Sequence, residues 1–88
     1  MRFTVLVHEG EDKGYWGECL ELPGCISQGE TLDEMDYNIR EAIGLVLEVK
    51  LEDGEDVKDL KPGDPTLDHD PNVRRWEILV PVPEVSSV

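Results

Sequence analysis

The side chains in this sequence that could act as a nucleophile and its base are two cysteines and two histidines. Cys25 follows a Leu-Pro-Gly turn, and either His8 or His69 could take its proton in nucleophilic catalysis. No basic residue stands near Cys25 in the sequence to lower the pKa of its thiol, and the acidic neighbours would raise it. We therefore expect a reduced, packed thiol in a turn, and no catalytic nucleophile.

Metal-ligating side chains gather in one acidic stretch that is rich in Pro and Gly: Asp64, Asp68, His69 and Asp70. This stretch has neither the spacing of an EF-hand loop nor a pair of His residues at helical spacing. The C-x5-C spacing of Cys19 and Cys25 also lacks the second Cys/His pair of a zinc site. The stretch is interpreted as a solvated loop, so we expect no metal and no cofactor.

Two-metal nucleases need carboxylates on core strands that converge on one point. The first apolar segment, residues 2–8, contains no Asp or Glu. Glu18 and Glu77 fall in later strand-like segments, but at positions where we expect the side chain to face solvent. The sequence therefore favours a protein that is not an enzyme.

The net charge of −13 over 88 residues limits the partners of the chain. Such a surface repels nucleic-acid backbones and anionic lipid but attracts a basic protein. The same charge would also arise from a need for solubility alone. No apolar run is long enough to span a membrane, and the N-terminus lacks the features of a signal peptide. We expect a cytoplasmic protein that binds neither nucleic acid nor membrane.

Alternation of apolar and polar residues predicts strands at residues 2–8 and 15–20, a short third strand at 25–28 and a last strand within 74–82. In the last strand, Trp76, Ile78 and Val80 should face inward. A Pro-Gly turn at 23–24 should connect the second and third strands.

A helix is predicted to begin at Thr31, because Thr31 and Glu34 form a Thr-x-x-Glu capping box. It should end near residues 53–54 (Asp-Gly). Apolar residues recur between these limits at helical spacing: Leu32, Met35, Ile39, Ala42, Ile43, Val46, Leu47 and Val49.

This order, ββ(β)αβ, predicts an α+β fold with a mostly antiparallel sheet and one helix packed on one face. We expect a single domain over residues 1–83, with an acidic surface loop at 51–72 that carries a turn near 57–60, and a tail at 84–88. One helix covers only one sheet face, so Leu6, Trp16 and Leu79 should lie on the other. Exposed apolar residues there would form an oligomer or partner surface.

The pattern of these motifs resembles the HicB antitoxin family. It comprises a Gly-Tyr-Trp run at 14–16, Pro23, Gly24, Cys25, Gly29, Thr31, Glu34, Asn38 and a Glu-Ala-Ile run at 41–43. The resemblance implies a partial ribonuclease-H-like sheet without nuclease residues. It also implies inhibition of a small basic HicA-type mRNA interferase. Many relatives add a C-terminal DNA-binding segment, which we do not expect after the last strand here.

Our leading hypothesis is therefore a non-catalytic, homo-oligomeric, antitoxin-like protein that occludes a basic HicA-like RNase. Acidic residues of the helix and the loop should provide charge complementarity: Asp36, Glu41, Asp68 and Asp70. The alternative is a stand-alone homo-oligomeric module with a structural or small-ligand role and no toxin. A third hypothesis is a residual metal-dependent hydrolase that uses acids such as Asp68 or Asp70.

Overall fold

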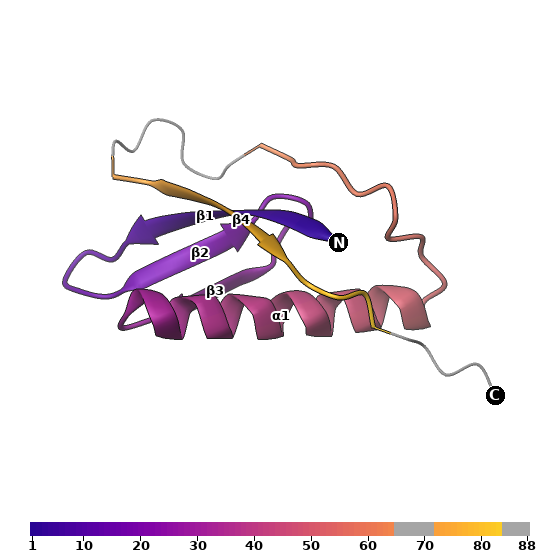
Figure 1. Ribbon diagram of the computed structural model, residues 1–88, viewed down its shortest axis with the longest axis horizontal. Coiled ribbons are helices and arrows are strands. Elements are labelled where there is room, and N and C mark those ends of the chain that lie inside the picture. The colour runs from indigo at the N-terminus through magenta and orange to yellow at the C-terminus, as the bar shows by residue number, and fades with distance from the viewer. Residues whose placement is uncertain (65–71, 84–88) are drawn as a thin grey trace.

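In the part of the chain that the structure describes, four strands form one sheet, and a single long helix lies across one of its faces (Figure 1). The computed structural model describes residues 1–64 and 72–83. Its elements in chain order are β1 (Arg2–Glu9), β2 (Tyr15–Cys19), β3 (Ile26–Gly29), α1 (Leu32–Glu52) and β4 (Arg74–Leu79). The predicted α+β fold and its element order are confirmed.

The strands pair in the order β3-β2-β1-β4, and every neighbouring pair is antiparallel. The last strand therefore returns to the free side of β1 after the chain has passed along the helix. Met1 and Val80 extend this pairing, since the Met1 ammonium donates to the Val80 carbonyl at 3.0 Å and the Val80 N–H donates to the Met1 carbonyl at 2.9 Å. The start and the end of the domain are thus held together in one ladder.

Short sequence motifs form a turn and a helix start at the positions predicted from the sequence. Gly24 has a φ of +87°, which L side chains rarely adopt, and the Cys25 N–H donates to the Leu22 carbonyl at 2.9 Å. At the start of α1 the Thr31 hydroxyl accepts from the Glu34 N–H at 3.1 Å. The turn leads β2 into β3, and the helix cap fixes how β3 leads into α1.

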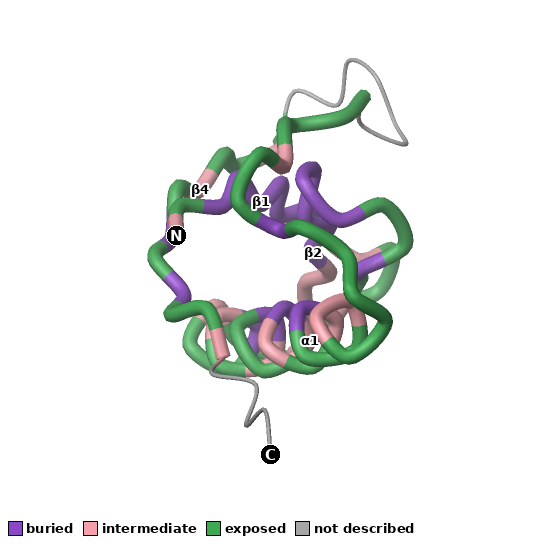
Figure 2. The backbone as a smooth tube through the Cα atoms, turned by 90° about the vertical axis from the view of Figure 1, so that its right-hand side faces the viewer, coloured by how far each residue is buried: buried purple, intermediate pink, exposed green. Residues whose placement is uncertain are grey.

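The core lies between the sheet and the inner side of α1, as Figure 2 shows by the buried positions on the facing sides of both layers. From the helix it receives Met35, Ile39, Ile43 and Leu47, all fully buried. From the sheet it receives Phe3, Val5, Val7 and Ile78, with Val80 just beyond β4 and a partly buried Trp76 packed against them. Burial of each large apolar side chain stabilises the fold by roughly 1.5–3 kcal/mol.

The segment after the helix is mostly exposed, as a surface loop should be, and a turn lies at residues 58–59. Val57 is an exception, because only 2% of it is exposed and it joins the core. Val57, with the partly buried Leu60 packed against the same core, therefore anchors the first part of the acidic segment. Asp68 and Asp70 lie outside the described residues.

Three side chains differ in exposure from the sequence-based expectation. Leu6 and Glu18 were expected on an open sheet face, yet they are only 8% and 6% exposed. Leu6 lies in a central strand, opposite Glu18 on one side and Arg75 on the other, and these long side chains flank it. Val49 was expected to face inward but is 55% exposed. It stands about 200° around the helix from buried Leu47, at roughly 100° per residue.

Candidate functional site

Neither cysteine is available as a nucleophile. Cys19 and Cys25 are both free thiols, and both are buried. Burial raises the pKa of Cys19 to about 12 and also raises the pKa of Cys25. Since the thiolate is the reactive form, both groups are poor nucleophiles near neutral pH.

His8, the proposed base, is fixed on the other face of the sheet. Its ring stacks on that of Trp16 with centroids 3.9 Å apart, and its Nε2 lies 3.0 Å from Glu18 Oε2. Cys25 belongs instead to the core beneath the helix. The structure therefore does not bring His8 and Cys25 together. His69 lies outside the described residues.

A second buried carboxylate, which the sequence reasoning missed, closes the end of the β1–β2 pair. Glu21 Oε1 accepts from the Thr4 backbone N–H at 2.7 Å, and Oε2 accepts from the Thr4 hydroxyl at 3.0 Å. Glu21 is 6% exposed. Its position between two leucines was the available signal that this acid is buried. Its bonds replace a strand pairing, so its role is structural.

Residues of the family-like motif gather where β3 meets the start of α1. A Cβ added to Gly29 would lie 2.5 Å from the Met35 backbone nitrogen, so only glycine allows the helix to start this close to the strand. Asn38 Nδ2 donates to the Gln28 carbonyl at 2.8 Å. With Trp16 and Glu34, Gly29 and Asn38 line a polar hollow of about 650 Å³. Pro23 and Gly24 are exposed in their turn, away from this hollow.

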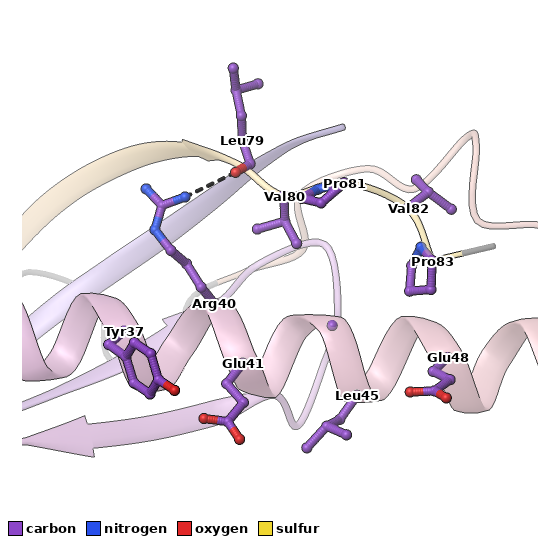
Figure 3. Close-up of a pocket in the computed structure, with 11 residues that line it drawn as sticks. Tyr37, Arg40, Glu41, Leu45, Glu48, Leu79, Val80, Pro81, Val82 and Pro83 are labelled. Carbon is purple, nitrogen blue, oxygen red and sulfur yellow. Dashed lines mark hydrogen bonds between the residues drawn. The ribbon is translucent and has the colours of Figure 1, made fainter.

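A more apolar groove of about 580 Å³ runs between α1 and the chain that follows β4 (Figure 3). Its lining comprises apolar and small residues from both segments: Tyr37, Gly44, Leu45, Leu79, Val80, Pro81, Val82 and Pro83. Glu41 and Glu48 stand on the helix side with Arg40. We call this feature the α1–β4 groove.

One polar link crosses the α1–β4 groove. Arg40 donates through Nη1 to the Leu79 carbonyl at 2.9 Å and through Nε to Asp36 Oδ1 at 2.9 Å. This cation is therefore already engaged by groups of the same chain. Glu41 and Glu48 are exposed carboxylates, so the charge offered to a partner at the groove is negative.

Those residues of the predicted partner surface that the structure describes do not form one patch. Leu79, which is 65% exposed, and Glu41 both line the α1–β4 groove. Leu6 is buried, Trp16 is half-buried against His8, and Asp36 is held by Arg40.

Sequence reasoning missed Tyr37 and Leu45, although two large apolar residues at outward helix positions were a signal for this surface.

Within residues 1–64 and 72–83, no group of three or more His, Cys, Asp or Glu side chains is arranged to hold a metal ion. Asp64 is exposed. In the same part of the chain, no helix has both the length and the apolar character needed to cross a membrane.

The described residues thus form a small α+β domain with one helix and a largely apolar groove beside it. A family profile described as "HicB_like antitoxin of bacterial toxin-antitoxin system" matches residues 3–84. The chain therefore belongs to the HicB-like antitoxin family, as the motif resemblance implied.

Relatives with similar sequences are UPF0150 proteins. One from Synechocystis sp. is 42% identical over 50 residues, covering 57% of this chain and 69% of the relative. One from Archaeoglobus fulgidus is 44% identical over 57 residues, covering 62% of this chain and 83% of the relative.

Solved structures show the same fold. The N-terminal domain of the Burkholderia pseudomallei antitoxin HicB has a TM-score of 0.74 and 28% identity, covering 92% of this chain and 99% of that one. A chain of a HicA3 and HicB3 toxin-antitoxin complex has a TM-score of 0.64 and 18% identity, with 92% and 99% coverage, which supports the fold alone.

Proposed function

We propose that this chain is a non-catalytic antitoxin, which binds a small basic HicA-type mRNA interferase and covers its RNA-binding and catalytic surface. The observation that carries this proposal is the match of nearly the whole chain, residues 3–84, to the HicB-like antitoxin family. The structural similarity to the N-terminal domain of the Burkholderia pseudomallei antitoxin HicB, at 28% identity, supports the same role.

The charge of the chain supports a basic partner. A net charge of −13 on 88 residues creates a field that accelerates the approach of a cationic protein. An RNase that binds RNA must present cations to the phosphate backbone. An acidic protein that docks on those cations competes directly with RNA, so binding and inhibition result from one contact.

The geometry of the described residues supports a role without catalysis. The raised pKa values of both thiols leave little thiolate at neutral pH. The His8 ring is buried between Trp16 and Glu18, away from Cys25. The exposed surface instead carries charged and apolar side chains, which can contact another protein.

The test is inhibition of a HicA-type protein encoded in the same genome. Purified toxin is incubated with an RNA substrate and increasing amounts of this chain, and the Kd is measured by calorimetry at low and high salt. We expect RNA cleavage to stop near a fixed molar ratio, and the Kd to rise with salt because exposed charges are screened. An unrelated acidic protein of equal net charge is the control. Full cleavage in the presence of excess chain at low salt would contradict the proposal.

A second candidate is a homo-oligomeric module without a toxin. The observation that favours it is the exposure of Tyr37, Leu45 and Leu79, which are 68%, 58% and 65% exposed and would be buried between copies. Light scattering distinguishes the two functions. A stable dimer or larger assembly that leaves every HicA-type toxin active would favour the module.

A further inference from the structure

We propose that the α1–β4 groove is the surface on which the basic partner docks, and that the partner fills it with an amphipathic helix. The partner helix would lie along α1, with an apolar side chain over Gly44 and Lys or Arg side chains paired with Glu41 and Glu48. This inference rests on the proposed function and adds the contact surface and the shape of the occupant.

Gly44 is the first observation. It lies in the middle of α1, where glycine costs about 1 kcal/mol of helix stability relative to alanine. A Cβ added at this position would meet nothing within 4 Å. The described chain therefore gives no packing reason for a glycine here. The contrast is Gly17, where an added Cβ would lie 2.5 Å from Met35 Cε. A missing side chain on an open helix surface allows a second helix to approach closely.

The apolar lining is the second observation. Tyr37, Leu45 and Leu79 are more than half exposed, although the fold contains enough apolar residues to complete a core without them. Figure 3 shows Leu79 and the Val80–Pro83 segment on one side of the groove and the helix side chains on the other. Arg40 links the two sides of the groove through its hydrogen bond to the Leu79 carbonyl. A groove with two apolar walls and a gap at Gly44 fits a protruding side chain of a partner.

The spacing of the acids defines the occupant further. Glu41 and Glu48 are seven residues apart on α1, which places them about 10.5 Å apart along the axis at 1.5 Å per residue. Basic residues two turns apart on a partner helix have the same spacing. Their apolar neighbours at intervening positions would then face Gly44 and Leu45, so one amphipathic helix satisfies both features.

Charge complementarity favours a basic partner over a second copy of this chain. Arg40 is engaged by Asp36 and by the Leu79 carbonyl, so Glu41 and Glu48 determine the charge of the groove. A second copy would bring the same two acids and a net charge of −13 to the contact. Like charges across an interface oppose association, whereas a cationic helix neutralises these acids.

The test compares variants of the chain for binding to the HicA-type protein used above. Gly44→Leu fills the gap, and the double change Glu41→Lys with Glu48→Lys reverses the charge of the groove. The matched control is Glu11→Lys with Glu30→Lys, since both acids are exposed and lie outside the α1–β4 groove. The control changes the net charge by the same amount as the double groove variant. A loss of binding in the groove variant alone would therefore report a local contact and not long-range attraction.

We expect each groove variant to raise the Kd for the toxin about tenfold or more, as truncation of a central interface contact does. The control should weaken binding much less. Thermal unfolding must show that Gly44→Leu is folded, which we expect because leucine is a better helix former than glycine.

The outcomes separate this inference from the function on which it rests. If the unaltered chain does not bind the toxin, the antitoxin function and the docking surface both fail. If the unaltered chain binds and the groove variants bind equally well, the function stands and the docking surface is wrong. If Gly44→Leu instead dissociates a dimer of the chain, seen by sedimentation, and leaves toxin binding unchanged, the occupant is a second copy and the proposal is overturned.

Discussion

Asn38 Nδ2 lies 2.8 Å from the backbone oxygen of Gln28, so a helix side chain binds the outer edge of β3. On the opposite edge of the sheet, Arg40 makes the equivalent contact with the Leu79 carbonyl at 2.9 Å. β3 and β4 are the two outer strands. Unpaired carbonyls on outer strands attract other chains and promote aggregation. The helix therefore covers one face of the sheet and also occupies a carbonyl at each edge.

Replacing Asn38 tests the first of these contacts. Asn38→Asp keeps the shape but places a carboxylate against the Gln28 carbonyl, so we expect the free energy of unfolding to fall by about 1 kcal/mol. Urea denaturation measures this change, and hydrogen exchange should show faster opening of β3. Asn38→Ala is the control for added charge, and it should destabilise less because alanine favours the helix. Equal stability of all three proteins would show that the contact contributes nothing.

Two glycine-to-alanine changes should have opposite signs. In Gly29→Ala the new Cβ would lie 2.5 Å from the Met35 nitrogen, so α1 or β3 must shift, and we expect a loss of about 1–3 kcal/mol. In Gly44→Ala the Cβ meets nothing within 4 Å, and we expect a gain of about 0.5–1 kcal/mol from helix propensity. Thermal unfolding measures both. A stabilised Gly29→Ala variant would contradict the close approach of the strand and the helix.

The local elements could be predicted from the sequence because each depends on neighbouring residues. Thr31 and Glu34 are three positions apart, so the cap that they form follows from the helix geometry alone. The alternation in β1 likewise identifies its inner face, because successive side chains point to opposite sides. Such signals fixed the order of elements and the inner side of the helix.

The second sheet face and the groove could not be predicted in the same way. Burial of Leu6 and Glu18 depends on which residues stand opposite them in other strands, and the register is not encoded locally. The α1–β4 groove depends on where residues 79–83 lie relative to Tyr37 and Leu45. Those contacts join segments far apart in the sequence, and the spacing of apolar residues within one segment cannot predict them.

Glu18 and Glu77 looked equivalent in the sequence, but their replacement should have different effects. Glu18 is 6% exposed and contacts His8 Nε2 at 3.0 Å, whereas Glu77 is exposed on β4. We expect Glu18→Ala to lower the free energy of unfolding by about 1–3 kcal/mol, since a buried polar partner loses its contact. Glu77→Ala should change it by less than about 0.5 kcal/mol. Urea denaturation of both variants measures these changes. Equal losses of unfolding free energy would mean that the buried Glu18–His8 contact does not stabilise the fold.

The buried thiols should make stability depend on alkaline pH. Burial raises the pKa of Cys19 from 9.0 to about 12, so the folded protein holds this proton more tightly than the unfolded chain does. The contribution of this thiol to stability is complete below pH 9.0 and is lost as the pH rises towards 12. Urea midpoints measured at about pH 8 and about pH 10.5 should therefore fall more for the unaltered chain than for Cys19→Ser, which has no thiol at this position to titrate.

Thiol labelling provides an independent measurement of the same burial. At about pH 8, a thiol-specific reagent should modify Cys19 and Cys25 far more slowly in the folded protein than in urea, because the reagent attacks the thiolate. Cys19→Ser and Cys25→Ser, labelled separately, assign the rate to each remaining thiol. Rapid labelling of Cys25 in the folded Cys19→Ser variant would mean that this turn opens in solution. A thiolate exposed beside the Leu-Pro-Gly turn would then restore the nucleophile that its burial excludes.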